Sequence, residues 1–149
     1  MLYFAYGSNM NLAQMRRRCP GAHFCGRGVL HDYRLVERCF ADIEEAAGAS
    51  VHGAVFEITS PDLRALDHYE GSGYIRKFVT VDLGTARIPM LVYQMTGPYR
   101  KRLTGMPYSP LYRKICRQGA AACRLPVNEF DEVTGNADST CIQKGQNHA

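Results

Sequence analysis

The chain has 149 residues, of which 46% are hydrophobic, and a formal net charge of +4 at pH 7. This length and apolar content suit one globular domain with a buried core and leave too little chain for two. The charge is only mildly basic, whereas a polyanion binder is normally more lopsided, so nucleic acid is not expected as the partner. The basic clusters at 16–18, 100–102 and 113–114 are expected to be solvated faces.

Two further absences bear on location. The six cysteines form no C-x-x-C pair and show no Cys/His spacing typical of a zinc site. No stretch approaches the roughly 18 apolar residues of a membrane helix, and no secretory signal precedes the first expected strand. The sequence therefore predicts a cytoplasmic protein without a membrane partner.

The opening stretch, Leu2 to Asn9, joins an apolar aromatic run to an abrupt stop at Gly7-Ser8-Asn9. The run predicts a buried strand, and Gly7 permits a sharp turn or a close approach of the backbone. Asn11 is a suitable cap for a helix over Leu12–Arg16. A strand that breaks into a helix in this way presents main-chain N–H groups without internal acceptors, which suits an anion or oxyanion. The alternative is that Gly-Ser-Asn is simply a good turn.

The rest of the chain alternates between strand and helix patterns. His23–Arg38 predicts two short strands joined at His31-Asp32, and residues 41–50 predict a loop. Val51–Ile58 predicts a strand in which Gly53 marks a bulge or a close approach. Further elements are expected in this order: a helix over Asp62–Glu70 capped by Ser60 and ended by Gly71, strands over Tyr74–Val81 and Ile88–Met95, a basic loop over Gly97–Pro107, a helix over Leu111–Gly119 begun by Ser109-Pro110, and a short helical stretch from Leu125 to Phe130.

This order is neither a regular βαβ repeat nor all-β. It fits the α+β class: a small mixed, mostly antiparallel β-barrel of about five to six strands, flanked by helices. Residues 1–133 are expected to form a single domain, and the polar residues 134–149 a mobile C-terminal tail.

Glu70 is the candidate catalytic group. It follows Leu63 and Leu66 at spacings that place it on the core-facing side of the helix, and it lies in the last turn, where the helix dipole is negative. Both effects disfavour its charged form, which suits a carboxyl group that transfers protons. The alternative is that the helix has frayed there and Glu70 reaches water. Asp67 is the competing carboxylate, but it lies off that line and is expected to be solvated or to cap.

Three motifs resemble motifs of the γ-glutamylcyclotransferase family and follow one another in the family's order. The likeness runs from about Leu2 to about Glu129. The three motifs are Tyr6-Gly7-Ser8-Asn9, Leu66-Asp67-His68-Tyr69-Glu70-Gly71 followed by Tyr74, and Pro110-Leu111-Tyr112-Arg113-Lys114-Ile115.

The resemblance implies a small barrel with a pocket at its mouth. There Tyr6, Gly7, Ser8 and Asn9 would bind the γ-glutamyl group, and Glu70 would be the catalytic glutamate. Tyr74, Tyr99 and Tyr112 resemble the family's substrate-facing tyrosines. The chain departs from the family in its short segment from Glu70 to Tyr74, its basic cluster at 100–102 and its C-terminal tail, which concern the leaving-group side of the pocket.

The chemistry that the resemblance implies fits the residues. The sequence contains no G-x-S-x-G motif and no Cys tied to a His base, and a γ-glutamyl amide carries its own nucleophile in its α-amine. Closure on the γ-carbonyl gives 5-oxoproline and a free amine, and requires neither a metal nor a cofactor. The expected partner is thus a small γ-glutamyl compound, with the protein as a monomer or homodimer. The alternatives are a cyclotransferase for γ-glutamyl-ε-lysine or another γ-glutamylamine, and a non-catalytic small-molecule binder of the same fold.

Overall fold

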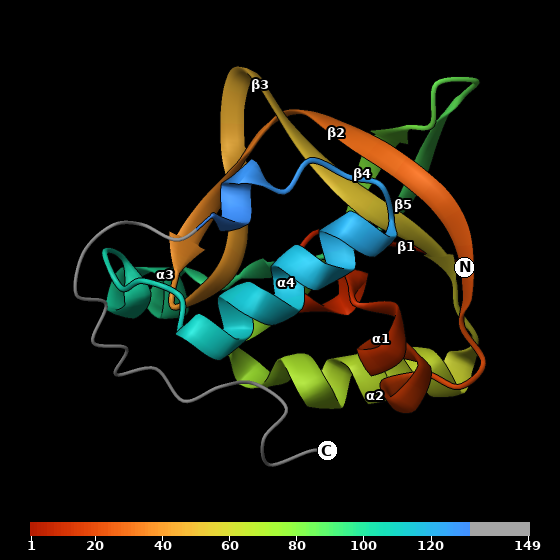
Figure 1. The fold of residues 1–149 in the computed structure, drawn as a ribbon, viewed down its shortest axis with the longest axis horizontal. Helices are drawn as coiled ribbons and strands as arrows, with labels where there is room; N and C mark the ends of the chain where they lie inside the picture. Colours follow the sequence, from red (N-terminus) through yellow and green to blue (C-terminus); the bar gives the residue numbers. More distant parts are fainter. Residues whose placement is uncertain (132–149) are drawn as a thin grey trace.

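Five strands close into a barrel in the order β1-β3-β2-β4-β5 (Figure 1). The computed structural model describes residues 1–131, so the predicted tail and the end of the predicted domain lie outside the described residues. The strands are β1 (Leu2–Ala5), β2 (His23–Arg38), β3 (Phe40–Glu57), β4 (Tyr74–Asp82) and β5 (Arg87–Met95). All neighbours are antiparallel except β1 and β5, which pair in parallel where Tyr3 lies opposite Leu91. The α+β barrel predicted from the sequence is confirmed.

Helices cover the barrel and connect its strands (Figure 1). They are the α-helices α1 (Leu12–Arg18), α2 (Ser60–Glu70), α3 (Gly97–Leu103) and α4 (Pro110–Ala122), and the 3₁₀ turns η1 (Ser8–Met10), η2 (Gly71–Gly73) and η3 (Asn128–Phe130). No helix within residues 1–131 is both long and apolar enough to cross a membrane.

Side chains at the helix starts satisfy main-chain N–H groups that have no partner inside the helix. Asn11 accepts from the N–H of Gln14 at the start of α1, as predicted. The cap of α2 is Thr59 rather than the predicted Ser60. Thr59 forms a capping box with Asp62, in which each side chain accepts from the other residue's N–H.

The prediction of a loop over residues 41–50 is wrong, because this segment belongs to β3 and pairs with β2. The two predicted strands of 23–38 are likewise one continuous strand, bent at Asp32, which has a positive φ of 62°. The register shifts beside Asp32, and the Asp32 carboxylate accepts from the N–H of Gly48 across the bend. The turn-like residues at His31-Asp32 mark a bend inside one long strand and not the end of a strand. Local sequence does not distinguish the two, because the pairing with β3 is not visible in it.

The basic loop predicted over Gly97–Pro107 is wrong for its first seven residues, which are helical, and residues 104–107 lie outside any helix or strand. Residues 97–103 form α3, because the Thr96 side chain caps the helix by accepting from the N–H of Tyr99 and Pro98 occupies the first turn. The basic cluster at 100–102 thus lies on a helix.

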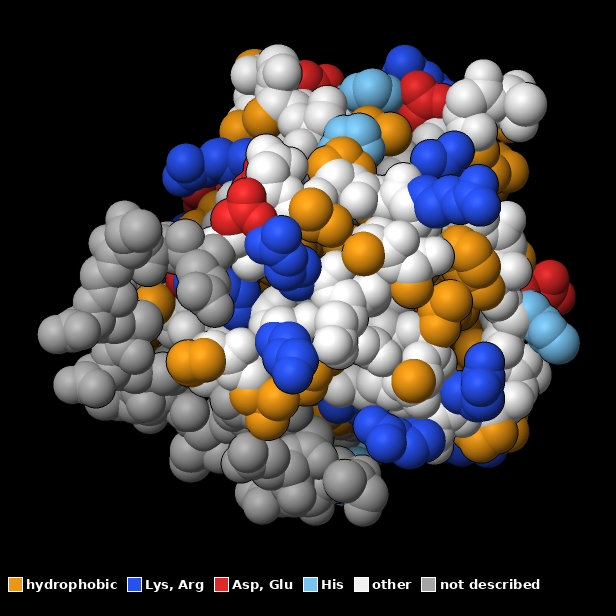
Figure 2. Space-filling view, in the orientation of Figure 1, with side chains coloured by type: hydrophobic (Ala, Val, Ile, Leu, Met, Phe, Trp, Pro, Cys, Tyr) orange, Lys and Arg blue, Asp and Glu red, His pale blue; other side chains and the backbone are white. Residues whose placement is uncertain are grey.

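One face of the molecule carries its positive charge in scattered positions. On the face in Figure 2, Lys and Arg side chains are separated by neutral and apolar surface and do not gather in one stripe. This face therefore lacks the continuous basic patch that is typical of nucleic-acid binding.

Close packing at Gly53 yields the first testable prediction. A Cβ at this position would lie 2.5 Å from the Phe4 ring and 2.6 Å from the main-chain oxygen of Ala5, so the predicted close approach is confirmed. Gly53→Ala is expected to lower the free energy of unfolding by about 1–3 kcal/mol, as overpacking does. Urea unfolding measures this, with Gly97→Ala as the control, because a Cβ on Gly97 meets nothing within 4 Å. Equal stability of the two variants would contradict the prediction.

Candidate active site

A small pocket lies where β1 ends and α2 ends. Its lining residues are Tyr3, Tyr6, Gly7, Ser8, Asn9, Ala41, Glu70, Tyr74, Tyr93 and Tyr112. The volume is about 20 Å³, enough for roughly one water-sized group. The pocket is partly open to solvent, so a larger ligand would extend beyond this volume.

Gly7 brings the main chain close to the opposite wall of this pocket. A Cβ here would lie 2.9 Å from the Tyr112 hydroxyl oxygen and 3.1 Å from the Cβ of Ala41. The φ of Gly7 is −118°, so close approach rather than backbone conformation requires glycine. Ser8 and Asn9 follow as the first residues of η1, where main-chain N–H groups have no acceptor within the turn. The turn therefore presents main-chain donors at the pocket.

The side chains of the same turn are engaged by the protein. Asn9 donates to the Tyr3 hydroxyl at 3.0 Å and accepts from Arg18 at 2.7 Å. The Ser8 hydroxyl lies 3.3 Å from the Tyr69 hydroxyl. These contacts hold the turn in place. Because the Ser8 and Asn9 side chains already have partners, the main-chain N–H groups of the turn are its candidate ligand-binding groups.

Three tyrosine hydroxyls fix the wall of the pocket. Tyr6 donates to the main-chain oxygen of Tyr93 at 2.5 Å, and Tyr74 donates to that of Ala41 at 2.7 Å. The Tyr112 hydroxyl accepts from the Ala41 N–H at 3.1 Å and keeps its own O–H to donate. Burial raises the pKa of Tyr6, Tyr74 and Tyr112 well above the ordinary value, so these hydroxyls keep their protons even in alkaline solution.

Glu70 lies in the same pocket, half-buried, as the last residue of α2. The helix has not frayed there, because the N–H of Gly71 donates to the Asp67 main-chain oxygen and Gly71 ends the helix with a φ of 70°. The carboxylate acts on the surrounding tyrosines: burial raises the pKa of Tyr3, and the charge of Glu70 raises it further. Glu70 is thus an acidic group among neutral hydroxyls and main-chain donors.

Asp67, the competing carboxylate, does not line the pocket. It pairs with Arg76 and accepts from the Tyr93 hydroxyl at 2.6 Å. The hydrogen bond from Arg76 lowers the pKa of Asp67, with a further contribution from Tyr93, so this group stays ionised. It is half-exposed and is held by Arg76 and by Tyr93, and Tyr93 itself lines the pocket.

The structure gathers most of the predicted site residues but not Tyr99. Tyr6, Gly7, Ser8, Asn9, Glu70, Tyr74 and Tyr112 all line the pocket. Tyr99 is half-buried on α3 and packs edge-on against Tyr74, with ring centroids 5.8 Å apart. It supports a lining residue without being one.

Sequence reasoning missed three lining residues, Tyr3, Tyr93 and Ala41. Tyr3 and Tyr93 meet edge-on at 5.9 Å only because β1 pairs with β5 as the barrel closes. Ala41 contributes main-chain groups, which leave no signal in the amino-acid sequence.

Within residues 1–131, no three His, Cys, Asp or Glu side chains gather as a metal site requires.

The mouth of a β-barrel is a frequent location of small-molecule sites. The chain belongs to the family described as Gamma-glutamyl cyclotransferase, AIG2-like, which matches residues 3–112. It is 33% identical to the Gamma-glutamylcyclotransferase of Bos taurus over 142 residues, covering 85% of this chain and 73% of the bovine protein. It is 31% identical to the Homo sapiens protein of the same name over 150 residues, covering 88% and 75%.

Solved structures agree with this membership. The human structure titled uncharacterized protein loc79017 superposes with a TM-score of 0.76 at 29% identity, covering 92% of both chains. A structure titled Gamma-glutamyl cyclotransferase gives a TM-score of 0.71 at 28% identity, covering 93% of both. The family resemblance inferred from the three motifs is confirmed.

The buried tyrosines predict a loss of stability in alkali. Burial raises the pKa of Tyr69 to about 12 from an ordinary value of 10.0. Below pH 10 the folded and unfolded states both keep this proton, whereas between pH 10 and 12 only the unfolded state loses it, so stability falls as pH rises. At pH 11, such a group alone lowers the free energy of unfolding by about 1.4 kcal/mol relative to pH 8.

Urea unfolding at pH 8 and pH 11 tests this. The loss between these pH values should be smaller in Tyr69→Phe by roughly that amount. An equal loss in both proteins would contradict it.

Proposed function

We propose that the protein is a γ-glutamylcyclotransferase. The substrate's α-amine attacks its own γ-carbonyl carbon, a five-membered lactam forms, and the bond to the leaving nitrogen breaks. The products are 5-oxoproline and a free amine. The observation that carries the proposal is Glu70 in one small pocket with the main-chain donors of the Gly7–Asn9 turn.

The first task of the pocket is to fold the substrate. Both reacting groups belong to one molecule, so holding the chain in its attacking conformer removes much of the entropic barrier, worth about 7–11 kcal/mol in well-oriented intramolecular reactions. A narrow pocket of rigid aromatic side chains suits this task, because its walls leave few conformers open.

The second task is proton transfer, which we assign to Glu70. As the amine attacks, its nitrogen must lose a proton, and the leaving nitrogen must gain one before the C–N bond breaks. One carboxylate beside the reacting centre performs both transfers in turn and ends in its starting state. Such general acid–base catalysis contributes typically ~10²- to 10⁴-fold.

The third task is to stabilise the negative oxygen of the tetrahedral intermediate. The N–H groups of Ser8 and Asn9 face no acceptor within η1, and the Tyr112 O–H keeps a hydrogen to donate. We propose that these groups bind that oxygen, where each donor is typically worth about 3–4 kcal/mol.

The direct test is a panel of γ-glutamyl dipeptides and γ-glutamyl-ε-lysine, with 5-oxoproline measured as product. Release from the dipeptides supports the leading assignment, whereas release from γ-glutamyl-ε-lysine alone selects the γ-glutamylamine alternative. Binding without any release would identify a non-catalytic binder.

Cytoplasmic location and the monomeric or homodimeric state stay predictions from the sequence.

Glu70→Gln is expected to lower kcat at least a hundredfold, because the amide cannot accept and return the proton. The change is nearly isosteric, so circular dichroism and thermal unfolding should match the wild type. Steady-state kinetics with the best dipeptide of the panel measure the effect.

Asp67→Asn is the matched control on the same helix, and its kcat should stay within a few-fold of wild type. Near-normal turnover of Glu70→Gln would exclude this role for Glu70. Equal damage from both variants would mean that the two carboxylates act together.

Gly7→Val is expected to abolish detectable turnover. A Cβ at Gly7 already lies 2.9 Å from the Tyr112 oxygen, so valine displaces either that hydroxyl or the turn. Thermal unfolding should first confirm that the variant folds. A folded Gly7→Val protein with full activity would show that the turn takes no part in catalysis.

A further inference from the structure

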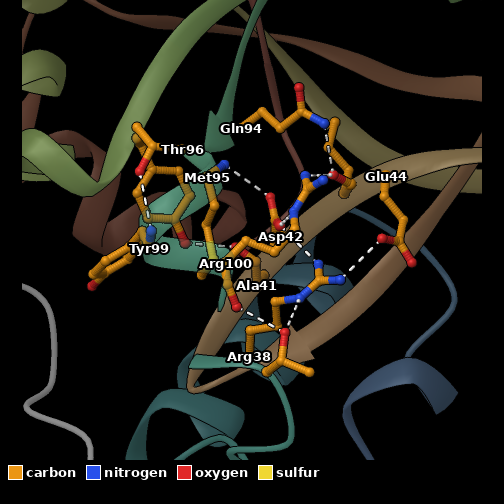
Figure 3. A network of polar contacts seen from close by, with 12 residues as sticks. Arg38, Ala41, Asp42, Glu44, Gln94, Met95, Thr96, Tyr99 and Arg100 are labelled. Carbon is orange, nitrogen blue, oxygen red and sulfur yellow. Dashed lines mark hydrogen bonds and ion pairs between the residues drawn. The ribbon is translucent and has the colours of Figure 1, made fainter. Parts of the chain in front are cut away.

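A buried carboxylate, Asp42, directly follows the pocket-lining residue Ala41 in β3 and lies within a network of polar contacts (Figure 3). Its side chain is fully buried on β3. One oxygen accepts from Arg38 at 2.8 Å and from Arg100 at 3.1 Å, and the other accepts from the main-chain N–H of Met95 at 2.9 Å. We call Asp42, Arg38 and Arg100 the Asp42 cluster.

The Asp42 cluster joins parts of the chain that are far apart in sequence. Arg38 ends β2, Met95 ends β5 and Arg100 lies on α3. Arg100 also donates to the main-chain oxygen of Ile43 at 3.1 Å, so it binds β3 at two points. The start of β3 is thereby fixed from three sides.

A buried cluster of charges of this kind is weak evidence for a role in stability. Burying charges carries a desolvation cost, and well-packed apolar side chains of similar volume often stabilise a fold equally well or better. Directional hydrogen bonds, in contrast, define a single position for the group that they hold. The geometry is therefore suited to fixing a position.

The residue positioned is Ala41, which precedes Asp42 in β3. Its N–H donates to the Tyr112 hydroxyl at 3.1 Å, and its main-chain oxygen accepts from the Tyr74 hydroxyl at 2.7 Å. Both tyrosines line the pocket that Glu70 also lines. A displacement of Ala41 would therefore move both hydroxyls relative to the reacting groups.

We propose that Asp42, Arg38 and Arg100 are positioning residues for the reaction, acting through the main chain of Ala41 on the hydroxyls of Tyr74 and Tyr112. This inference rests on the proposed function. It also assigns a role to part of the basic segment: Arg100 turns inward as a link between α3 and β3.

Arg100→Gln tests the inference with the least disturbance, because Arg100 is partly exposed, whereas Arg38 and the Met95 N–H still pair with Asp42. We expect kcat to fall about tenfold and KM to change less than threefold, since small displacements of catalytic groups act mainly on the transition state. Lys101→Gln is the matched control: it removes the same charge from the exposed side of α3 and should keep wild-type kinetics.

A second comparison separates positioning from general loosening of the fold. In a Tyr74→Phe/Tyr112→Phe background, Arg100→Gln should lower kcat by at most twofold, because the hydroxyls through which it acts are gone. A tenfold loss in that background, or wild-type kcat for Arg100→Gln in the unaltered protein, would overturn the inference.

Asp42→Asn is the complementary variant and should also lower kcat about tenfold or more in the fraction of protein that folds. If wild-type protein and Lys101→Gln release no 5-oxoproline from any γ-glutamyl compound, the proposed function fails and this inference fails with it. If both are active and Arg100→Gln equals them, only the inference fails.

Discussion

The hydrogen bonds at Ala41 connect the barrel to its pocket. One residue of β3 uses both of its main-chain polar groups to hold a tyrosine from α4 and a tyrosine from β4. The approach of Gly7 to the Tyr112 hydroxyl depends on the same arrangement, since a side chain at Gly7 would collide with that hydroxyl and with Ala41. The turn after β1, the start of β3 and the helix α4 are thus fixed against one another at one point.

This construction suits a reaction in which the substrate supplies the nucleophile. The pocket then needs no activated serine or cysteine, and its work is to orient one flexible molecule and to move a proton. Buried tyrosines provide a wall and hydrogen bonds without adding charge. The proposed acid–base group is a single glutamate, and the nearby Asp67 is paired with Arg76.

The sequence predicted the features that depend on neighbouring residues. The end of β1 at the Gly7 turn and the cap at Asn11 follow from local composition and spacing. The spacing on α2 also points Glu70 inward, and the structure places it in the pocket lining. The strand at 41–50 cannot be read from its own residues, because it depends on pairing with β2. The helix α3 depends on its cap at Thr96, which lies just before the basic segment. The part that Ala41 plays in the pocket could not be predicted from the sequence, because it comes from main-chain groups that any residue carries.

The most direct test of the account is a crystal structure of the protein with 5-oxoproline bound. We expect the product in the pocket at the end of β1, with its ring nitrogen within hydrogen-bond distance of the Glu70 carboxyl group and its ring carbonyl oxygen accepting from the N–H groups of Ser8 and Asn9. Product bound at another place, or bound in this pocket with Glu70 turned away from the ring, would contradict the central claim.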